Sequence, residues 1–275
     1  MPYGDESATF EPLNPSTVTM KTVEIFSPDN VTFRSFLKLT KVRGIKQHRR
    51  ALLSGRRQTE EVLKEFPDRC VGLVSCEEQL LPSIPGTGHI RCYRLSRELF
   101  RQLDLFGTGH PFLIVQFGSF PQFSDADDPP GCTLCIPFQD PANVGSMIRA
   151  AAGLGVSRVV LLKEAAHPFH PKSVRVAGSS IFRVPILEGP PLKQLAAYGA
   201  SLITLSPRGE DIAGYQFPSS FCLIPGLEGP GIPECLERAT ALAIPMKNGV
   251  ESLNAAMATG IALYLWQRGL DHEFN

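Results

Sequence analysis

The chain has 275 residues, 43% of them apolar, and equal numbers of acidic and basic side chains, so its formal net charge at pH 7 is zero. This composition excludes an intrinsically disordered chain, which is low in apolar residues and high in net charge. The length allows one or two domains. The longest apolar runs, such as 112–117 and 261–266, are far shorter than the about 20 residues that span a bilayer, and we expect no membrane association.

The first 30 residues contain Pro, Ser and Thr without clear periodicity, so we expect residues 1–30 to form an N-terminal extension. They lack the basic start and apolar core of a secretory signal, which indicates a cytoplasmic protein. Seven cysteines, an odd number spread over the whole chain, favour reduced thiols over a disulfide framework. Cys132 and Cys135 form a CxxC pair, but no second pair or nearby His completes a zinc site, so no metal is expected.

A strongly basic block lies between residues 34 and 59, where the chain has no Asp or Glu. Such a block favours a polyanionic partner such as RNA. The alternative is a solvated helical face. The basic side chains are Arg34, Lys38, Lys41, Arg43, Lys46, Arg49, Arg50, Arg56 and Arg57.

The first half of the chain predicts a small α/β domain over residues 31–118. A basic helical stretch comes first, and the pattern then predicts a helix over 59–66, a strand over 70–76, a helix over 96–106 and a strand over 111–117. Residues 119–131 are rich in Pro, Asp, Ser and Gly and poor in aliphatic residues, which is typical of a linker between compact units.

The second half, residues 132–275, predicts a larger α/β domain. Because strands and helices alternate, we expect a mostly parallel sheet covered by helices, with ligands bound at the carboxyl ends of the strands. Strands are predicted over 132–138, 158–162, 201–206, 221–226 and 241–246, and helices over 143–155, 170–180, 192–199, 232–240 and the C-terminal segment.

Three loops after predicted strands carry polar groups suited to chemistry. The first, 140–151, contains Asn143 and Arg149, which can also be read as a helix cap and a surface charge. The second, 223–234, brings three glycines and Glu228 to a turn before a helix, where backbone groups can crowd a ligand. It can also be a plain Gly-rich connection, with Glu228 as a helix-start carboxylate.

The third loop begins the segment IPMKNGVESLNAAMATGIALYLW, residues 244–266. Asn248 and Gly249 suit a turn, and Ser252 and Asn254 precede an apolar helix. Taken alone, Ser252 is more simply a helix N-cap than a catalytic group.

Together, in this order and spacing, the three loops resemble the SpoU/TrmH family of the SPOUT RNA methyltransferases. The family's first motif, an Asn, a Gly and then an Arg, is matched by Asn143, Gly145 and Arg149. Its second, a Gly-x-Glu-Gly turn, is matched by GLEGPG at 226–231, although Leu227 stands where relatives carry a small or hydroxylated residue.

The family's third motif, Ile-Pro-Met followed by Gly-Val-Glu-Ser-Leu-Asn, is matched by IPMKNGVESLN at 244–254. The resemblance covers about residues 133–266. In the first half, ALLSGRRQTEEVL at 51–63 resembles a segment of the ribosomal-protein-L30e-like substrate domain of many relatives, although Ser54 replaces the usual acidic residue.

The resemblance implies a C-terminal domain tied in a deep trefoil knot, which binds S-adenosylmethionine in a bent conformation and forms a homodimer. It also implies that the three loops build the cofactor pocket. The implied cofactor-binding residues are Leu205, Ser206, Gly226, Ile244, Met246 and Leu253.

The implied reaction is methyl transfer from the sulfonium to a ribose 2′-hydroxyl of RNA, an in-line displacement in which the hydroxyl must lose its proton. Arg149 is the residue that relatives use, but its pKa makes it a poor free base. We expect it to grip an RNA phosphate and stabilise the alkoxide, with the phosphate or a transiently deprotonated arginine taking the proton. The other implied catalytic-site residues are Asn143, Glu228, Ser252 and Asn254.

RNA contacts are expected from the basic block and from the loop at 167–175. His167 and His170 look like a metal pair, but no third ligand is near, and phosphate contact is the favoured use of this loop. The expected RNA-binding residues are Arg43, Lys46, Arg49, Arg50, Arg56, Arg57, Lys172 and Arg175.

Two other classes of protein stay open from the sequence. One is a catalytically silent RNA-binding or assembly protein that retains the fold, and the other is a nicotinamide-dependent Rossmann enzyme. The intact motif residues oppose the first, and the lack of a GxGxxG after the first strand opposes the second. By analogy with relatives that carry such an N-terminal domain, ribosomal RNA is favoured over tRNA as the substrate.

Overall fold

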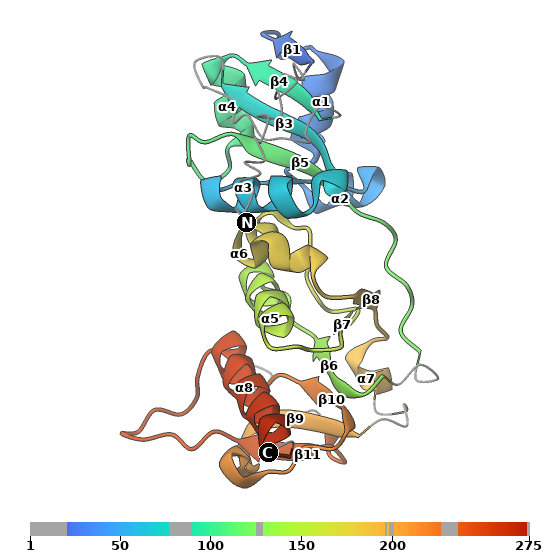
Figure 1. Cartoon of the computed structure of the whole chain (residues 1–275), viewed down its shortest axis with the longest axis vertical. Coiled ribbons are helices and arrows are strands. Elements are labelled where there is room, and N and C mark those ends of the chain that lie inside the picture. Colours follow the sequence, from blue (N-terminus) through green and yellow to red (C-terminus); the bar gives the residue numbers. More distant parts are fainter. Residues whose placement is uncertain are drawn as a thin grey trace, which may run out of the picture.

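A computed structural model describes residues 21–76, 90–124, 129–195, 197, 201–226 and 236–273. Two α/β lobes lie one above the other along the long axis of the molecule (Figure 1). The N-terminal lobe is built on a five-stranded sheet, and the C-terminal lobe on a six-stranded sheet. Both sheets confirm the predicted mixed α/β class.

The N-terminal lobe has strand order β1-β4-β3-β5-β2, in which β1, β4 and β3 run parallel and β5 and β2 pair antiparallel. The first helix begins where the Asn30 carboxamide oxygen accepts hydrogen bonds from the next turn's N–H groups, and it buries Phe33 and Phe36. The strands are β1 (Thr22–Ile25), β2 (Arg50–Leu53), β3 (Cys70–Cys76), β4 (Arg91–Leu95) and β5 (Phe112–Gln116), and the helices are α1 (Val31–Lys38), α2 (Val42–His48), α3 (Arg56–Glu65), the 3-10 turn η1 (Pro67–Arg69) and α4 (Arg97–Leu103).

The expected N-terminal extension of residues 1–30 is too long. Residues 22–25 form β1, whose partner is β4, and Ile25 lies in the core of the lobe. The four-residue strand is short and exposes three of its four side chains, so its apolar content does not stand out in the sequence. Residues 1–20 lie outside the described part of the chain.

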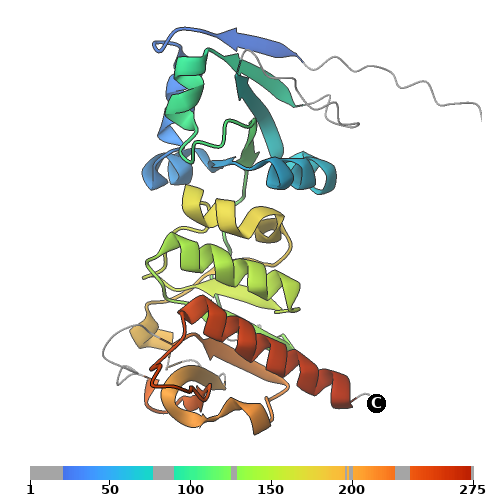
Figure 2. The ribbon, with the colours of Figure 1, turned by 90° about the vertical axis from the view of Figure 1, so that its left-hand side faces the viewer.

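The C-terminal lobe has strand order β11-β9-β10-β6-β7-β8, and every neighbouring pair is parallel. This confirms the expected parallel sheet. Helices α6, α5 and α8 follow one below the other on the face turned toward the viewer in Figure 2. The strands are β6 (Gly131–Ile136), β7 (Arg158–Leu161), β8 (Ile186–Glu188), β9 (Leu202–Asp211), β10 (Ser220–Ile224) and β11 (Thr240–Ala243), and the helices are α5 (Pro141–Gly153), α6 (Pro171–Ala177), η2 (Gly178–Phe182), α7 (Leu192–Leu195), η3 (Ile212–Gly214) and α8 (Ala255–Glu273).

Residues 227–235, which connect β10 to β11, lie outside the described residues. They contain Glu228 and the first four residues of the predicted helix 232–240, whose described remainder is not an α-helix. Thr240, the last residue of that predicted helix, instead begins β11. The deep trefoil knot stays a prediction from the family resemblance.

The segment 119–131, predicted to be a linker, is partly built into the C-terminal lobe. The backbone at 121–123 pairs with Glu188 at the end of β8, and the Gln122 side chain donates a 2.8 Å hydrogen bond to the Glu188 carboxylate. Phe123 is buried, and the guanidinium of the buried Arg158 lies 5.0 Å from the centre of its ring. The C-terminal lobe therefore begins near residue 121, and not at residue 132 as the composition of the segment predicted.

The two lobes share one continuous apolar core, in which Ile45 and Val62 of the N-terminal lobe join Val174 and Ile181 of the C-terminal lobe. Polar contacts reinforce the junction. Ser179 donates a 2.7 Å hydrogen bond to the Glu61 carboxylate, and Arg183 forms ion pairs with Glu61 and Glu65 of α3. The Ser179 hydroxyl, with a smaller contribution from Arg183, lowers the pKa of Glu61. The lobes thus meet across a packed interface.

No helix in the described part of the chain is long and apolar enough to cross a membrane.

Candidate functional site

The first motif occupies the start of α5. Asp140 caps the helix, because its carboxylate accepts a 3.0 Å hydrogen bond from the Ala142 N–H, and Pro141 fills the first helical position. Asn143 is therefore not the helix cap. It lies within the first turn of the helix and is half-buried, while Arg149 is exposed on the same helix. Within the described residues, the Arg149 guanidinium has no hydrogen-bond or ion-pair partner.

Gly145 lets α6 approach α5 closely. A β-carbon on Gly145 would lie 2.4 Å from the carbonyl oxygen of Ser173, which is a backbone atom of α6. The Ser173 hydroxyl in turn donates a 2.7 Å hydrogen bond to the carbonyl oxygen of Pro141. The motif glycine thus serves the packing of α5 against α6.

The third motif forms the loop between β11 and α8, which extends away from the body of the C-terminal lobe (Figure 1). Asn248 and Gly249 have positive φ angles of 56° and 73°, and the Val250 N–H donates to the Lys247 carbonyl, so the predicted turn is confirmed. Asn254, and not Ser252, caps α8. Its side-chain oxygen accepts hydrogen bonds of 3.0 and 3.3 Å from the N–H groups of residues 256 and 257.

The first and third motifs meet at these helix starts. The Asn254 side-chain nitrogen donates a 3.1 Å hydrogen bond to the side-chain oxygen of Asn143. Two motifs that are 111 residues apart in the chain therefore share one direct polar contact, which the sequence alone could not reveal. Ser252 is exposed in the preceding loop.

The predicted cofactor residues of β9 and β10 also meet. The pairing of β9 with β11 jumps from Thr204 to Glu210, so residues 205–209 bulge out of the ladder. Leu205 and Ser206 begin this bulge. A β-carbon on Gly226, just after β10, would lie 2.7 Å from the Leu205 carbonyl oxygen, so the loop after β10 lies directly against the bulge.

The remaining predicted cofactor residues follow β11. Ile244 is half-buried against the main apolar core, and Met246 and Leu253 are half-buried within the loop. Because β11, β9, β10 and β6 are neighbours in a parallel sheet, their carboxyl ends lie along one edge. Glu228 lies outside the described residues.

The two histidines of the 167–175 loop accept backbone hydrogen bonds through Nδ1. His167 accepts from the Phe169 N–H and His170 from the Lys172 N–H, both at 3.2 Å, and His170 caps α6. Burial is the main cause that lowers the pKa of His167 to about 4, and burial also lowers the pKa of His170. Both rings are therefore expected to be neutral at pH 7.

The basic side chains predicted to bind RNA are exposed. Two of them have partners within the protein. Arg56 pairs with Glu60 at 3.1 Å on the surface of α3, and the Arg175 guanidinium lies 4.4 Å from the centre of the Phe106 ring. Arg175 thus joins α6 to the N-terminal lobe, a contact that its place in a basic loop did not indicate.

Cys132 and Cys135 belong to two different core clusters. Side chains three residues apart in a strand point to opposite faces of the sheet. The CxxC pair therefore does not present both thiols to one ion.

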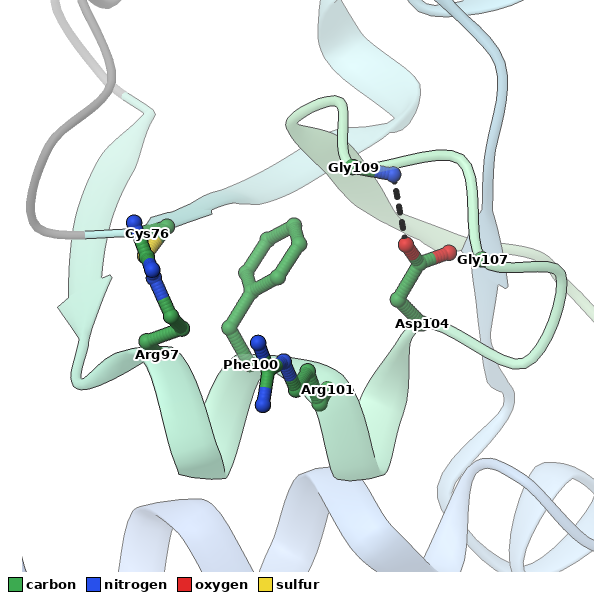
Figure 3. A pocket seen from close by; sticks show the side chains of 7 residues that line it. All are labelled: Cys76, Arg97, Phe100, Arg101, Asp104, Gly107 and Gly109. Atoms are coloured by element: carbon green, nitrogen blue, oxygen red, sulfur yellow. Dashed lines mark hydrogen bonds between the residues drawn. The ribbon is translucent and has the colours of Figure 1, made fainter.

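A pocket in the N-terminal lobe lies apart from the three motifs. Cys76 and Phe100 line it together with Arg97 and Arg101 of α4 (Figure 3). At the other side, the Asp104 carboxylate accepts a 2.7 Å hydrogen bond from the Gly109 N–H.

Comparison with solved structures supports the fold. The AdoMet-bound rRNA methyltransferase from Sinorhizobium meliloti superposes with a TM-score of 0.74 at 22% identity, over 90% of this chain and 98% of that chain. The SpoU rRNA methylase family profile matches residues 134–264. The 23S rRNA (guanosine(2553)-2′-O)-methyltransferase RlmP of Bacillus subtilis is 31% identical over 219 residues, which cover 78% of this chain and 86% of that protein. The chain belongs to the SpoU rRNA methylase family.

The SpoU profile covers all three motif loops. A further relative, named ribosomal RNA small subunit methyltransferase G 2 of Syntrophobacter fumaroxidans, is 43% identical over 246 residues, or 89% of this chain. The aligned region is 49% of that protein, so the chain spans about half the length of this relative.

Two substitutions of Asn254 should distinguish its role in stability from its role in activity. Asn254→Ala removes both the helix cap and the contact with Asn143, and we expect it to lower the free energy of unfolding by about 1 kcal/mol and to impair methyl transfer. Asn254→Ser retains a capping oxygen but cannot donate through an amide nitrogen. It should therefore keep most of the stability and still lose activity. Urea unfolding and methyl-transfer assays test this, and full activity in the Ser variant would show that the contact with Asn143 is not needed.

Proposed function

We propose that the protein transfers a methyl group from S-adenosylmethionine to a ribose 2′-hydroxyl of RNA. The hydrogen bond between Asn143 and Asn254 carries the proposal, because it joins the first and third family motifs, which follow β6 and β11 at the carboxyl edge of the parallel sheet. The reaction named for the relative in Bacillus subtilis is of this type.

The residues present fit S-adenosylmethionine. The loop after β10 can lie against the Leu205 carbonyl only because residue 226 is Gly, and such crowded backbone is suited to holding a flat ligand through amides and carbonyls. Leu205, Ile244, Met246 and Leu253 would provide the apolar contacts, and Ser206 a polar one. When bound, the cofactor supplies an electrophilic methyl group on a sulfonium.

Arg149 would act on the RNA. Its guanidinium is exposed and has no partner within the described residues, so it is available to grip a phosphate in a bidentate manner and to stabilise negative charge on the 2′-oxygen. These contacts would hold the 2′-oxygen so that it can accept the methyl group that bound S-adenosylmethionine would supply, with the sulfur as the leaving group. The hydroxyl proton passes to the phosphate or to a transiently deprotonated Arg149.

The other motif residues would position these groups. Asn254 holds Asn143, which would orient the substrate or Arg149, and the exposed Ser252 would contact the target nucleotide. Glu228 is proposed to fix neighbouring backbone or an arginine of a second subunit.

A homodimer through the C-terminal lobe forms part of the proposal. Met257 and Tyr264 of α8 are 58% and 51% exposed, and they lie two turns apart on one face of the helix. Val250, in the extended third-motif loop, is 51% exposed. A second subunit packed here would cover this apolar surface and bring the loop against its partner.

The proposed substrate is structured RNA in the cytoplasm, with ribosomal RNA favoured over tRNA. The name of the Bacillus subtilis relative supports the ribosomal choice, as do the SpoU family profile and a separate basic N-terminal lobe. The N-terminal lobe would bind the RNA, as expected for an L30e-like domain.

The function is tested by incubating the protein with radiolabelled S-adenosylmethionine and RNA from cells that lack the gene. Label should enter the RNA, and the bond after the labelled nucleotide should resist alkaline hydrolysis, because that hydrolysis needs a free 2′-hydroxyl. Label that enters the base and leaves all bonds alkali-sensitive would exclude ribose methylation. RNA binding without any transfer would favour the catalytically silent alternative.

Charge reversal in the basic block should weaken RNA binding in a salt-dependent way. Arg49→Glu and Arg50→Glu should each remove a phosphate interaction, and the slope of log affinity against log salt should fall by about 0.7–0.9 for each phosphate no longer neutralised. Lys163→Glu and Lys193→Glu, both exposed in the C-terminal lobe, serve as controls with the same change in charge. An equal decrease of the slope in both pairs would assign the effect to net charge alone. The same comparison extends to Arg56 and Arg57.

A further inference from the structure

Three phenylalanine rings lie nearly parallel at the junction of the two lobes. The ring centres of Phe117 and Phe169 are 4.0 Å apart with an angle of 8° between the planes. Phe120 is tilted by only 7° from Phe117 at 5.9 Å, and by 15° from Phe169 at 6.2 Å. Phe169 is buried, while Phe117 and Phe120 remain half-buried and thus reach solvent.

Basic residues lie near this aromatic stack. The Phe117 N–H donates a 3.1 Å hydrogen bond to the Arg49 carbonyl, and Arg50 pairs with Gln116 at the end of β5, so the backbone of both arginines runs next to the segment that carries Phe117. Lys46 of α2 is close enough to His167 to contribute to lowering its pKa, and the His167 ring lies 5.7 Å from Phe117. All three basic side chains are exposed.

The stack is also tied to the catalytic end of the C-terminal lobe. The Ser173 hydroxyl is within hydrogen-bond distance of the His167 carbonyl, at 3.4 Å, and of the Pro141 carbonyl, at 2.7 Å. Pro141 begins α5, which carries Asn143. The distance from the stack to the proposed active site is therefore fixed by packed structure.

Parallel aromatic rings that reach solvent among lysines and arginines suit an unpaired nucleotide, since bases stack on ring faces while cations hold the phosphates. A purely structural junction has no need of the exposed cations. We propose that Phe120 and Phe117 form a stacking platform for an unstacked base of the RNA substrate, next to phosphates held by Lys46, Arg49 and Arg50. This inference rests on the proposed function, and it identifies the place on the protein where an unpaired part of the RNA is held.

The test uses Phe120→Trp as a fluorescent reporter in the full chain. The only natural tryptophan, Trp266, is 5% exposed in the C-terminal core against Phe221, so it supplies a constant background. We expect a short single-stranded oligoadenylate to quench the fluorescence of the introduced indole. Inorganic polyphosphate, which has charge but no bases, should leave that fluorescence unchanged. Equal quenching by both would overturn the platform.

A second variant tests the platform without introducing a tryptophan, which could perturb the packing at the junction. Phe120→Leu retains apolar packing but has no ring face, and it should weaken oligoadenylate binding on the order of tenfold while polyphosphate binding stays the same. Unchanged oligoadenylate affinity would show that Phe120 only fills the junction. If the unsubstituted protein methylates RNA but neither the fluorescence of Phe120→Trp nor the affinity of Phe120→Leu changes as expected, only the stacking platform is overturned. If the unsubstituted protein does not bind RNA at all, the proposed function is overturned.

Discussion

Arg149→Ala should lower the rate of methyl transfer by at least about 10²–10³-fold while S-adenosylmethionine affinity stays nearly unchanged. The expected decrease is that of removing one preorganised group that stabilises charge in the transition state. Affinity should persist because the proposed cofactor contacts come from the bulge of β9 and the segments after β10 and β11, and Arg149 lies on the exposed side of α5. Single-turnover transfer and calorimetric titration of the cofactor measure the two quantities.

The conservative variant Arg149→Lys separates charge from geometry. Lys keeps the positive charge but cannot form a bidentate contact with a phosphate. We expect it to recover only a small part of the activity. Normal turnover in the Ala variant would remove Arg149 from the mechanism, and full activity in the Lys variant would exclude the bidentate contact.

Gly145→Ala should be strongly destabilising, although Ala normally favours a helix over Gly by about 1 kcal/mol. The added β-carbon would lie 2.4 Å from the Ser173 carbonyl oxygen, which belongs to the backbone of α6 and cannot rotate away. The helices would have to separate, and overpacking of this kind typically costs about 1–3 kcal/mol. The free energy of unfolding, measured by urea titration, should fall accordingly.

Gly153→Ala in the same helix is the matched control. A β-carbon on Gly153 has no neighbour within 4 Å among the described residues, so the substitution should be neutral or stabilising by up to about 1 kcal/mol. If both variants were equally stable, the close approach of α6 would not explain why residue 145 is Gly.

The sequence predicted elements and motifs that depend on local patterns. The buried strand β3 and the helix α3 were confirmed because their apolar spacing is regular over several residues. The turn at Asn248 and Gly249 was confirmed because these residue types tolerate positive φ. The short edge strand β1 was missed, since four mostly exposed residues leave no clear pattern.

The helix caps show where prediction from the local sequence fails. Ser252 and Asn143 both have cap-forming side chains near a helix start, yet the caps are Asn254 and Asp140. Several Ser, Asn and Asp residues stand at each start, and the backbone direction set by packing decides which one reaches the free N–H groups.

The sequence by itself determined the class of sheet and the family, because these follow from alternating patterns and from motifs that match the family's. It also named the residues of the candidate site, whose roles stay predictions. Only the tertiary structure decided that Asn254 bonds to Asn143, that Gly145 admits α6, and that Arg175 and the aromatic stack lie where the two lobes meet. Each of these contacts joins segments distant in the chain, and their proximity is set by how the sheet and helices pack, which no local run of residues encodes.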